Sequence, residues 1–217
     1  MREEEPPRRG TLVAVVGLDG AGKTTQVHAL GDWLASHGVP SMAQTSVSMA
    51  PVRAALTQIA HEDGFSNHLD MIGAETMRLI SACSKLARVA ALQESLRHSS
   101  DLVVLDRYTY CQYALAAAQQ VGNVTFLRRM FAGLPRPDLT IFLDVDPEAA
   151  ARRINDRGID TEDVVFLKEF REAYRSLPEF NDFVVVDGNG TREQVAGLLR
   201  ATLRSAFPDR FVKAAQA

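Results

Sequence analysis

The stretch Gly17-Leu18-Asp19-Gly20-Ala21-Gly22-Lys23-Thr24-Thr25 fits the pattern G-x-x-x-x-G-K-[ST] and follows an apolar run from Leu12 to Val16. A strand that ends in a glycine loop and continues as a helix points several backbone N–H groups and a helix N-terminus at one place, which then binds anions. The glycines let the backbone approach a phosphate closely. Lys23 can reach the β and γ oxygens of a nucleotide, and Thr24 can offer its hydroxyl to Mg²⁺. The stretch therefore predicts a phosphate-binding loop.

The composition is that of a single globular domain that binds a small molecule. The chain has 217 residues, of which 46% are hydrophobic and 24% are charged, so one sizeable core can form. A net charge of −3 and a pI near 6.0 give no broad attraction to nucleic acid or to anionic membranes. We therefore expect no nucleic-acid partner and no membrane partner.

Cysteine usage and hydropathy predict a cytoplasmic protein. The two cysteines, Cys83 and Cys111, lack metal-ligand spacing and are too few for a disulfide framework. No apolar run approaches the roughly 20 residues that span a bilayer. The segment Met1 to Gly10 is charged and contains proline, unlike a signal peptide, so we expect a disordered tail at 1–10.

The order of apolar runs predicts an α/β fold with a parallel sheet and helices on both faces. One long helix is expected from about Asp70 to Arg97, because helix formers with a broad apolar face fill that stretch. The single domain covers 11–206 and a C-terminal tail covers 207–217. Five strands are expected, at Thr11 to Val16, Met42 to Val47, Asp101 to Leu105, Leu139 to Leu143 and Phe183 to Val186.

Polar residues that follow these strands are the candidates for chemistry, because ligands of such sheets bind beyond the carboxyl ends of the strands. Asp106 can hold a Mg²⁺-bound water or fix the magnesium side of the phosphate loop, and Arg107 can bind a second phosphate. A simple salt bridge at the end of the strand is the alternative. Asp187-Gly188-Asn189 follows the fifth strand toward the same cleft.

Two arginines on the helix after Pro147 are further candidates. Arg153 and Arg157 are four residues apart and share one face, from which they can neutralise charge on a transferred phosphoryl group. A solvated helix face is the plainer interpretation. Asp144 and Asp146 are equally open, since Asp144 can simply end a strand and Asp146 can cap the helix.

This set of motifs resembles the thymidylate kinase family from about Leu12 to Leu199. The resemblance rests on the phosphate loop, Asp106-Arg107-Tyr108, the run from Pro137 to Asp144, and Asp146-Pro147-Glu148 with the two arginines. In that family a five-stranded parallel sheet carries the transfer of the γ-phosphate of ATP to dTMP. The resemblance implies homodimers that pair through helices, and the apolar segment Met71 to Leu96 can supply that face.

The resemblance also implies the roles of individual residues, with Mg²⁺ as cofactor and ATP as donor. A short lid lies near 153–163. The ATP-binding residues are Gly17, Asp19, Gly20, Ala21, Gly22, Lys23, Thr24 and Thr25; Thr24 and Asp106 serve Mg²⁺; Asp19 and Arg107 bind the acceptor; and Lys23, Arg107, Arg153 and Arg157 are catalytic.

The acceptor side departs from the family pattern in three segments. The usual Thr-Arg-Glu-Pro-Gly-Gly-Thr is replaced by the segment from Thr45 to Pro51, without the phosphate-contacting arginine. Where the family has charged, aromatic or amide groups, this chain has Ser46, Ile80, Ser84, Leu115 and Ala116. We therefore expect dTMP to be a poor substrate. The alternatives are a kinase of another nucleotide, a nucleoside or a small metabolite, and a nucleotide-binding protein without acceptor turnover.

Overall fold

One sheet of five parallel strands forms the centre of the protein, in the order β2-β3-β1-β4-β5. The computed structural model describes residues 10–46, 49–99, 101–120, 122–158 and 162–214. The predicted fold, a five-stranded parallel sheet with helices on both faces, is confirmed. The expected N-terminal tail lies outside the described residues except for Gly10, which is buried.

The central strands are buried on both faces, as their apolar runs predict. The described side chains of β1 and β3 are almost all buried, whereas β2 at one edge is mainly half-buried and β5 at the other buries only Phe183 and Val186. The strands are β1 (Thr11–Val16), β2 (Ser41–Gln44), β3 (Leu102–Asp106), β4 (Leu139–Asp144) and β5 (Phe183–Asp187).

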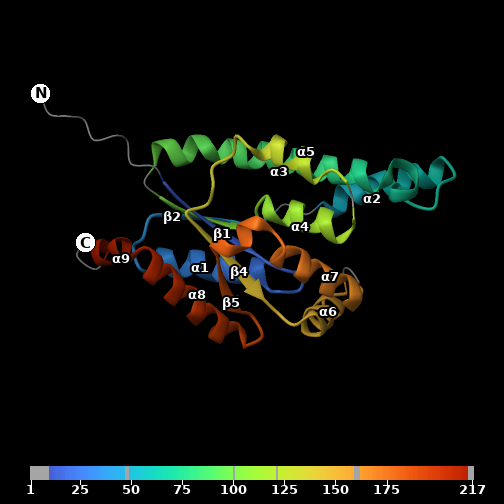
Figure 1. Ribbon diagram of the computed structural model, residues 1–217. Helices are drawn as coiled ribbons and strands as arrows, with labels where there is room; N and C mark the ends of the chain where they lie inside the picture. The colour runs from blue at the N-terminus through green and yellow to red at the C-terminus, as the bar shows by residue number, and fades with distance from the viewer. Residues whose placement is uncertain (1–9, 47–48, 100, 121, 159–161, 215–217) are drawn as a thin grey trace, which may run out of the picture.

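Helices cover both faces of this sheet (Figure 1). The helices α1 and α8 lie on one face, and α3, α4 and α5 lie on the other. No helix within the described ranges is both long and apolar enough to cross a membrane. The helices are α1 (Lys23–Ser36), α2 (Ala50–Glu62), α3 (His68–His98), α4 (Tyr110–Ala118), α5 (Val124–Phe131), α6 (Pro147–Asn155), α7 (Val164–Arg175), the 3₁₀ turn η1 (Pro178–Asp182), α8 (Arg192–Ala206) and α9 (Pro208–Ala214).

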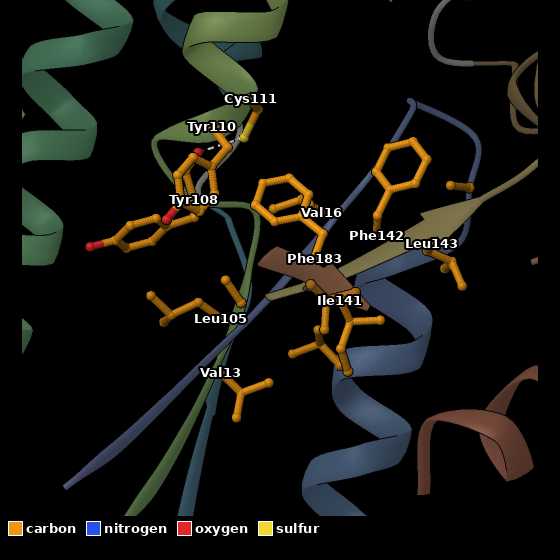
Figure 2. Packing of buried hydrophobic residues seen from close by; sticks show 14 of the residues in the cluster. Val13, Val16, Leu105, Tyr108, Tyr110, Cys111, Ile141, Phe142, Leu143 and Phe183 are labelled. Atoms are coloured by element: carbon orange, nitrogen blue, oxygen red, sulfur yellow. Dashed lines mark hydrogen bonds between the residues drawn. The ribbon is translucent and has the colours of Figure 1, made fainter. Parts of the chain in front are cut away.

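An aromatic layer joins the sheet to α4 and α7. Figure 2 shows Phe142 and Phe183 on the face of the sheet where Tyr110 lies. The ring centroids of Tyr110 and Phe183 are 4.9 Å apart, and those of Phe142 and the fully buried Tyr174 are 5.2 Å apart. Large rings at such spacings fill the space between layers and fix how α4 and α7 sit on the strand ends.

The long helix is interrupted, which corrects the expectation of one continuous helix from Asp70 to Arg97. α3 runs over His68–His98 but contains Gly73 at φ 77° and ψ 155°, outside the helical region. Only glycine adopts that conformation without a steric penalty, so the chain kinks there. The part before the kink follows α2 away from the sheet (Figure 1).

The C-terminal segment also differs from a plain tail. Residues 208–214 form α9, and the ring of Phe211 lies 5.2 Å from that of Trp33 on α1. The Arg210 side chain donates a hydrogen bond to Thr11 Oγ1 at 2.6 Å. The ordered domain therefore extends beyond Ala206.

Asp144 fastens α7 to the sheet at the end of β4. Its carboxylate accepts two hydrogen bonds from Arg171, both at 2.7 Å, and a third from Arg175 at 3.0 Å. Asp144 is 15% exposed and Arg171 is 21% exposed, so solvent screens this bidentate pair less than a surface pair. Of the two roles open for Asp144, the structure favours a positioning role over a chemical one.

We predict that Asp144→Asn lowers the free energy of unfolding by about 1 to 3 kcal/mol, because the half-buried guanidinium of Arg171 loses its charged partner. Urea unfolding measures the change. The control is Asp182→Asn, which breaks an exposed pair with Arg136 and should cost below about 1 kcal/mol. Equal losses in the two variants would show that Asp144 does not fasten α7.

Candidate active site

The ends of β1 and β3 lie side by side at one edge of the sheet. The two strands pair in parallel with Val15 opposite Asp106, and the Arg107 backbone N–H donates to the Val15 carbonyl at 2.8 Å. The loop that begins at Gly17 therefore starts next to Asp106 and Arg107. The structure brings these sequence-predicted residues together as the strand order requires.

The phosphate loop packs tightly against the neighbouring segments. Gly20 has φ 78°, and a Cβ atom there would lie 2.3 Å from the Ala150 carbonyl oxygen of α6. At Gly17 a Cβ atom would lie 2.6 Å from the Leu143 carbonyl oxygen of β4. Both positions exclude side chains for steric reasons, so the loop's backbone lies directly on β4 and α6.

Lys23 is buried beneath the loop. Its ammonium group donates to the Leu18 carbonyl oxygen at 2.5 Å and lies 3.7 Å from Asp19 Oδ1. Burial lowers the pKa of Lys23 to about 8, and the positive charge of Arg107 acts in the same direction. A polyanion that binds to the loop would stabilise the charged form of this buried ammonium group.

Thr24 and Asp106 form a unit that suits Mg²⁺. Thr24 Oγ1 donates to Asp106 Oδ2 at 2.5 Å, while Asp106 Oδ1 is buried and has no hydrogen-bond partner within the described chain. An unpaired buried carboxylate oxygen beside a hydroxyl fits a hydrated Mg²⁺, which takes oxygen ligands and keeps several waters. These residues therefore fit the predicted metal.

Arg107 combines an unusual backbone conformation with an ion pair to Asp19. Its backbone has φ 67°, in the left-handed region, which costs a non-glycine residue about 1 to 2 kcal/mol. Its guanidinium forms an ion pair with Asp19. Burial opposes the charge of Asp19, but Arg107 and Lys23 outweigh it and keep the pKa of Asp19 well below its usual range. The two side chains are thus fixed as ions at the mouth of the loop.

A cavity of about 430 Å³ opens beside these groups, within the usual size range of ligand sites. It lies at the carboxyl edge of the sheet between the phosphate loop, α2, α3, α4 and α7. Its charged and polar lining includes Asp19, Thr24, Arg53, Ser84, Lys85, Arg88, Asp106, Arg107, Gln112, Arg157 and Glu162. Cations outnumber carboxylates there, which favours an anionic ligand.

Comparison with known proteins identifies the family to which this phosphate loop and cavity belong. The family model for thymidylate kinase matches residues 15–197. The chain belongs to the thymidylate kinase family. It is 30% identical to the thymidylate kinase of Synechococcus sp. strain RCC307, with 86% of this chain and 92% of that protein covered. It is 28% identical to a probable thymidylate kinase of Thermococcus gammatolerans (86% and 92% covered) and 25% identical to the thymidylate kinase of Vibrio vulnificus (90% and 95% covered).

Membership of the thymidylate kinase family makes this protein an ATP-dependent nucleoside monophosphate kinase. The predicted donor residues are contiguous in the structure: Gly17 to Gly22 form the loop, and Lys23, Thr24 and Thr25 form the first turn of α1, with Lys23 buried and Thr25 exposed. The predicted acceptor residues Asp19 and Arg107 line the cavity next to that loop.

The two predicted lid arginines make different contacts in the structure. Arg157 lines the cavity, and its charge lies close enough to Asp19 to lower the pKa of that carboxyl. Arg153 instead donates from both Nη atoms to the Gly188 carbonyl oxygen, each at 3.2 Å. Part of the predicted lid, 159–161, lies outside the described residues.

Asp146 and the segment after β5 are tied to each other. Asp146 stands at the N-cap position of α6, but its side chain makes no capping hydrogen bond. Its backbone N–H donates to Asn189 Oδ1 at 2.9 Å, and Asn189 in turn donates to Asp187. These residues order the loops beside Arg153 and do not line the cavity.

Several residues that line the cavity are not among those predicted from the sequence, and four of them are polar or charged groups on helices. Arg53 comes from α2, Lys85 and Arg88 from α3, and Gln112 from α4. A signal was present on α3, because Ser81, Ser84, Lys85 and Arg88 repeat at helical spacing and form a polar stripe. The helix was predicted only as a packing element, because its apolar residues form the stronger pattern.

We predict that the affinity for ATP falls by about tenfold per pH unit as the pH rises above about 8, because the loop binds phosphates with protonated Lys23 and the free protein loses that proton near this pH. Fluorescence titration with ATP between pH 7 and 9.5 measures the effect. The Lys23→Arg variant, whose cation does not titrate, should show a flat profile. A flat profile for the unmodified protein would refute this role.

Proposed function

We propose that this protein uses Mg²⁺ to transfer the γ-phosphate of ATP to a nucleoside monophosphate in the cytoplasm, and that it acts as a homodimer. One observation carries the choice of acceptor. The Arg107 guanidinium, fixed by Asp19, lies in the cavity wall beside the phosphate loop, where a second phosphate would face the first. A planar guanidinium binds a phosphate more strongly than it binds a neutral hydroxyl, so the acceptor is expected to carry a phosphate.

The proposed reaction depends on positioning and on charge neutralisation. The loop amides and Lys23 hold the donor phosphates, and Arg107 places the acceptor's phosphate oxygen in line with them. Mg²⁺ held at Thr24 and Asp106 would neutralise donor charge. Arg157, from the segment after α6, would stabilise charge that develops on the transferred group.

The base side of the cavity supports an acceptor that need not be dTMP. Leu115 replaces an aromatic residue of the family, and Ser84 replaces an arginine. Gln112, one helical turn before Ala116 on α4, lines the cavity, and its Oε1 is buried without a hydrogen-bond partner in the described chain. The Gln112 side-chain amide can therefore bind a base from a position one helical turn before Ala116, where the family carries its amide. This shift favours a base whose size or hydrogen-bonding edge differs from that of thymine.

An ADP-release assay across nucleoside monophosphates, nucleosides and sugars tests this function. We expect turnover of at least one monophosphate and none of the parent nucleosides. For dTMP we expect kcat/KM to lie about 100-fold or more below the roughly 10⁴ M⁻¹s⁻¹ of slow natural enzyme reactions.

Three other outcomes would each overturn part of the proposal. Selective, efficient turnover of dTMP would show that other side chains hold thymine. Turnover of a nucleoside or sugar would reassign the acceptor class. Binding of ATP without any transfer would make the protein a nucleotide-binding module.

The lid arginines give a second test. We predict that Arg157→Ala lowers kcat by about 100-fold or more with little change in ATP affinity, because its charge acts on the transition state. Arg153→Ala should lower kcat less, since Arg153 binds the Gly188 carbonyl. Equal kcat values for both variants and the unmodified protein would show that Arg157, which follows the end of α6, is a solvated side chain without a role in transfer.

Support for a dimer comes from exposed apolar residues on α2 and the start of α3. Val52, Ile59, Phe65 and Leu69 are each 39% to 47% exposed, and Figure 1 shows this region extending past the sheet. The later residues of the expected face, such as Val89 and Leu92, are buried in the protein's own core. The dimer face is therefore better placed before the kink.

We predict a sedimentation species of twice 23.8 kDa at micromolar concentration, converted to the single-chain mass by Leu69→Asp. The substitution places a charge in the apolar contact. Leu198→Asp on α8, where the native leucine is 48% exposed, serves as control and should leave the assembly unchanged. A 23.8 kDa species for the unmodified protein would exclude the dimer.

A further inference from the structure

Lys85 occupies a particular place in the wall of the cavity. It lies on α3 and faces both the main cavity and a small void bounded by Gln44, Leu105 and Asp106, at the carboxyl ends of β2 and β3. Burial lowers the pKa of this lysine, and nearby Arg107 and Arg88 add to the effect. Lys85 is therefore a cation held close to the point where the phosphate loop and Arg107 meet.

The charge of Lys85 lacks a hydrogen-bonded or ion-paired partner among the residues that the structure describes. Asp106 is close enough to favour its charged form, but the carboxylate of Asp106 is already bonded to Thr24. Asp19 is paired with Arg107. Partial burial of an ammonium group without a partner is costly unless an anion binds there.

The other cation of α3 is used differently. Arg88 donates to the Thr45 carbonyl oxygen and so holds the segment after β2 in place. That segment presents Ser46, a neutral side chain, to the cavity. Lys85 of α3 brings a positive charge into the same cavity.

We infer that Lys85 binds the phosphate of the acceptor together with Arg107, and that this second cation makes the pocket select phosphomonoesters over neutral nucleosides. The inference rests on the proposed function, because it assumes that the acceptor carries a phosphate. Two cations from different elements would hold the acceptor's phosphate from two sides. A dianionic phosphate would then complete the charge balance of the cavity.

The test compares Lys85→Met with Lys85→Arg. The probe is the nucleoside monophosphate with the highest kcat/KM in the acceptor panel, and its parent nucleoside is the reference. Lys85→Met should raise KM for the monophosphate by about 10- to 100-fold, the effect of one charge-assisted hydrogen bond, with KM for ATP unchanged. In direct titration it should weaken binding of the monophosphate but not of the nucleoside. Lys85→Arg, which keeps the charge, should restore most of the loss.

Lys168→Met is the matched control, because Lys168 pairs with Glu148 at the surface and lies outside the cavity lining. Thermal unfolding of each variant checks that the fold is intact. If Lys85→Met weakens monophosphate and nucleoside equally, or behaves like Lys168→Met, Lys85 is structural and the inference is overturned. If the unmodified protein phosphorylates no monophosphate, the proposed function fails first and the inference falls with it.

Discussion

The parallel pairing of β1 with β3 is the constraint on which the site depends. It sets Val15 opposite Asp106 and therefore places the glycine loop, Asp106 and Arg107 at one edge of the sheet. The loop packs closely on its neighbours, because Gly17 and Gly20 lie against carbonyl oxygens of β4 and α6. The aromatic layer under α4 and the Asp144 clamp on α7 then hold the remaining walls of the cavity at that edge.

The charges that this pairing brings together explain why the site suits phosphates. Lys23, Arg107 and Lys85 are partly or fully buried, and one carboxylate, Asp19, pairs with both Arg107 and Lys23. Burial of cations is unfavourable in the free protein, so part of the folding free energy maintains a site that a phosphate completes. The left-handed backbone of Arg107 adds to that cost. Such a site is stabilised most when both the donor and the acceptor carry phosphate groups.

The fold and the place of the glycine loop in it could be predicted from the sequence because each rests on local signals. Apolar runs without alternation marked the buried strands, and the spacing of Gly17, Gly22 and Lys23 marked the phosphate loop. The kink at Gly73 was missed because one glycine in a helical pattern is often tolerated. Lys85 and Gln112 were missed because their role depends on which helix faces the loop, a property of tertiary packing. Arg153 and Arg157 share a helix face by sequence, yet Gly188 captures only one of them.

Our central proposal is that the donor phosphate and the acceptor phosphate bind in one cavity. Phosphorus NMR of the protein with ATP, Mg²⁺ and the nucleoside monophosphate that gives the fastest ADP release tests this most directly, because it identifies the bond that forms. We expect ADP and the nucleoside diphosphate of the acceptor to appear in equal amounts. Release of ADP with inorganic phosphate alone, or a new phosphate ester on a sugar hydroxyl, would contradict it.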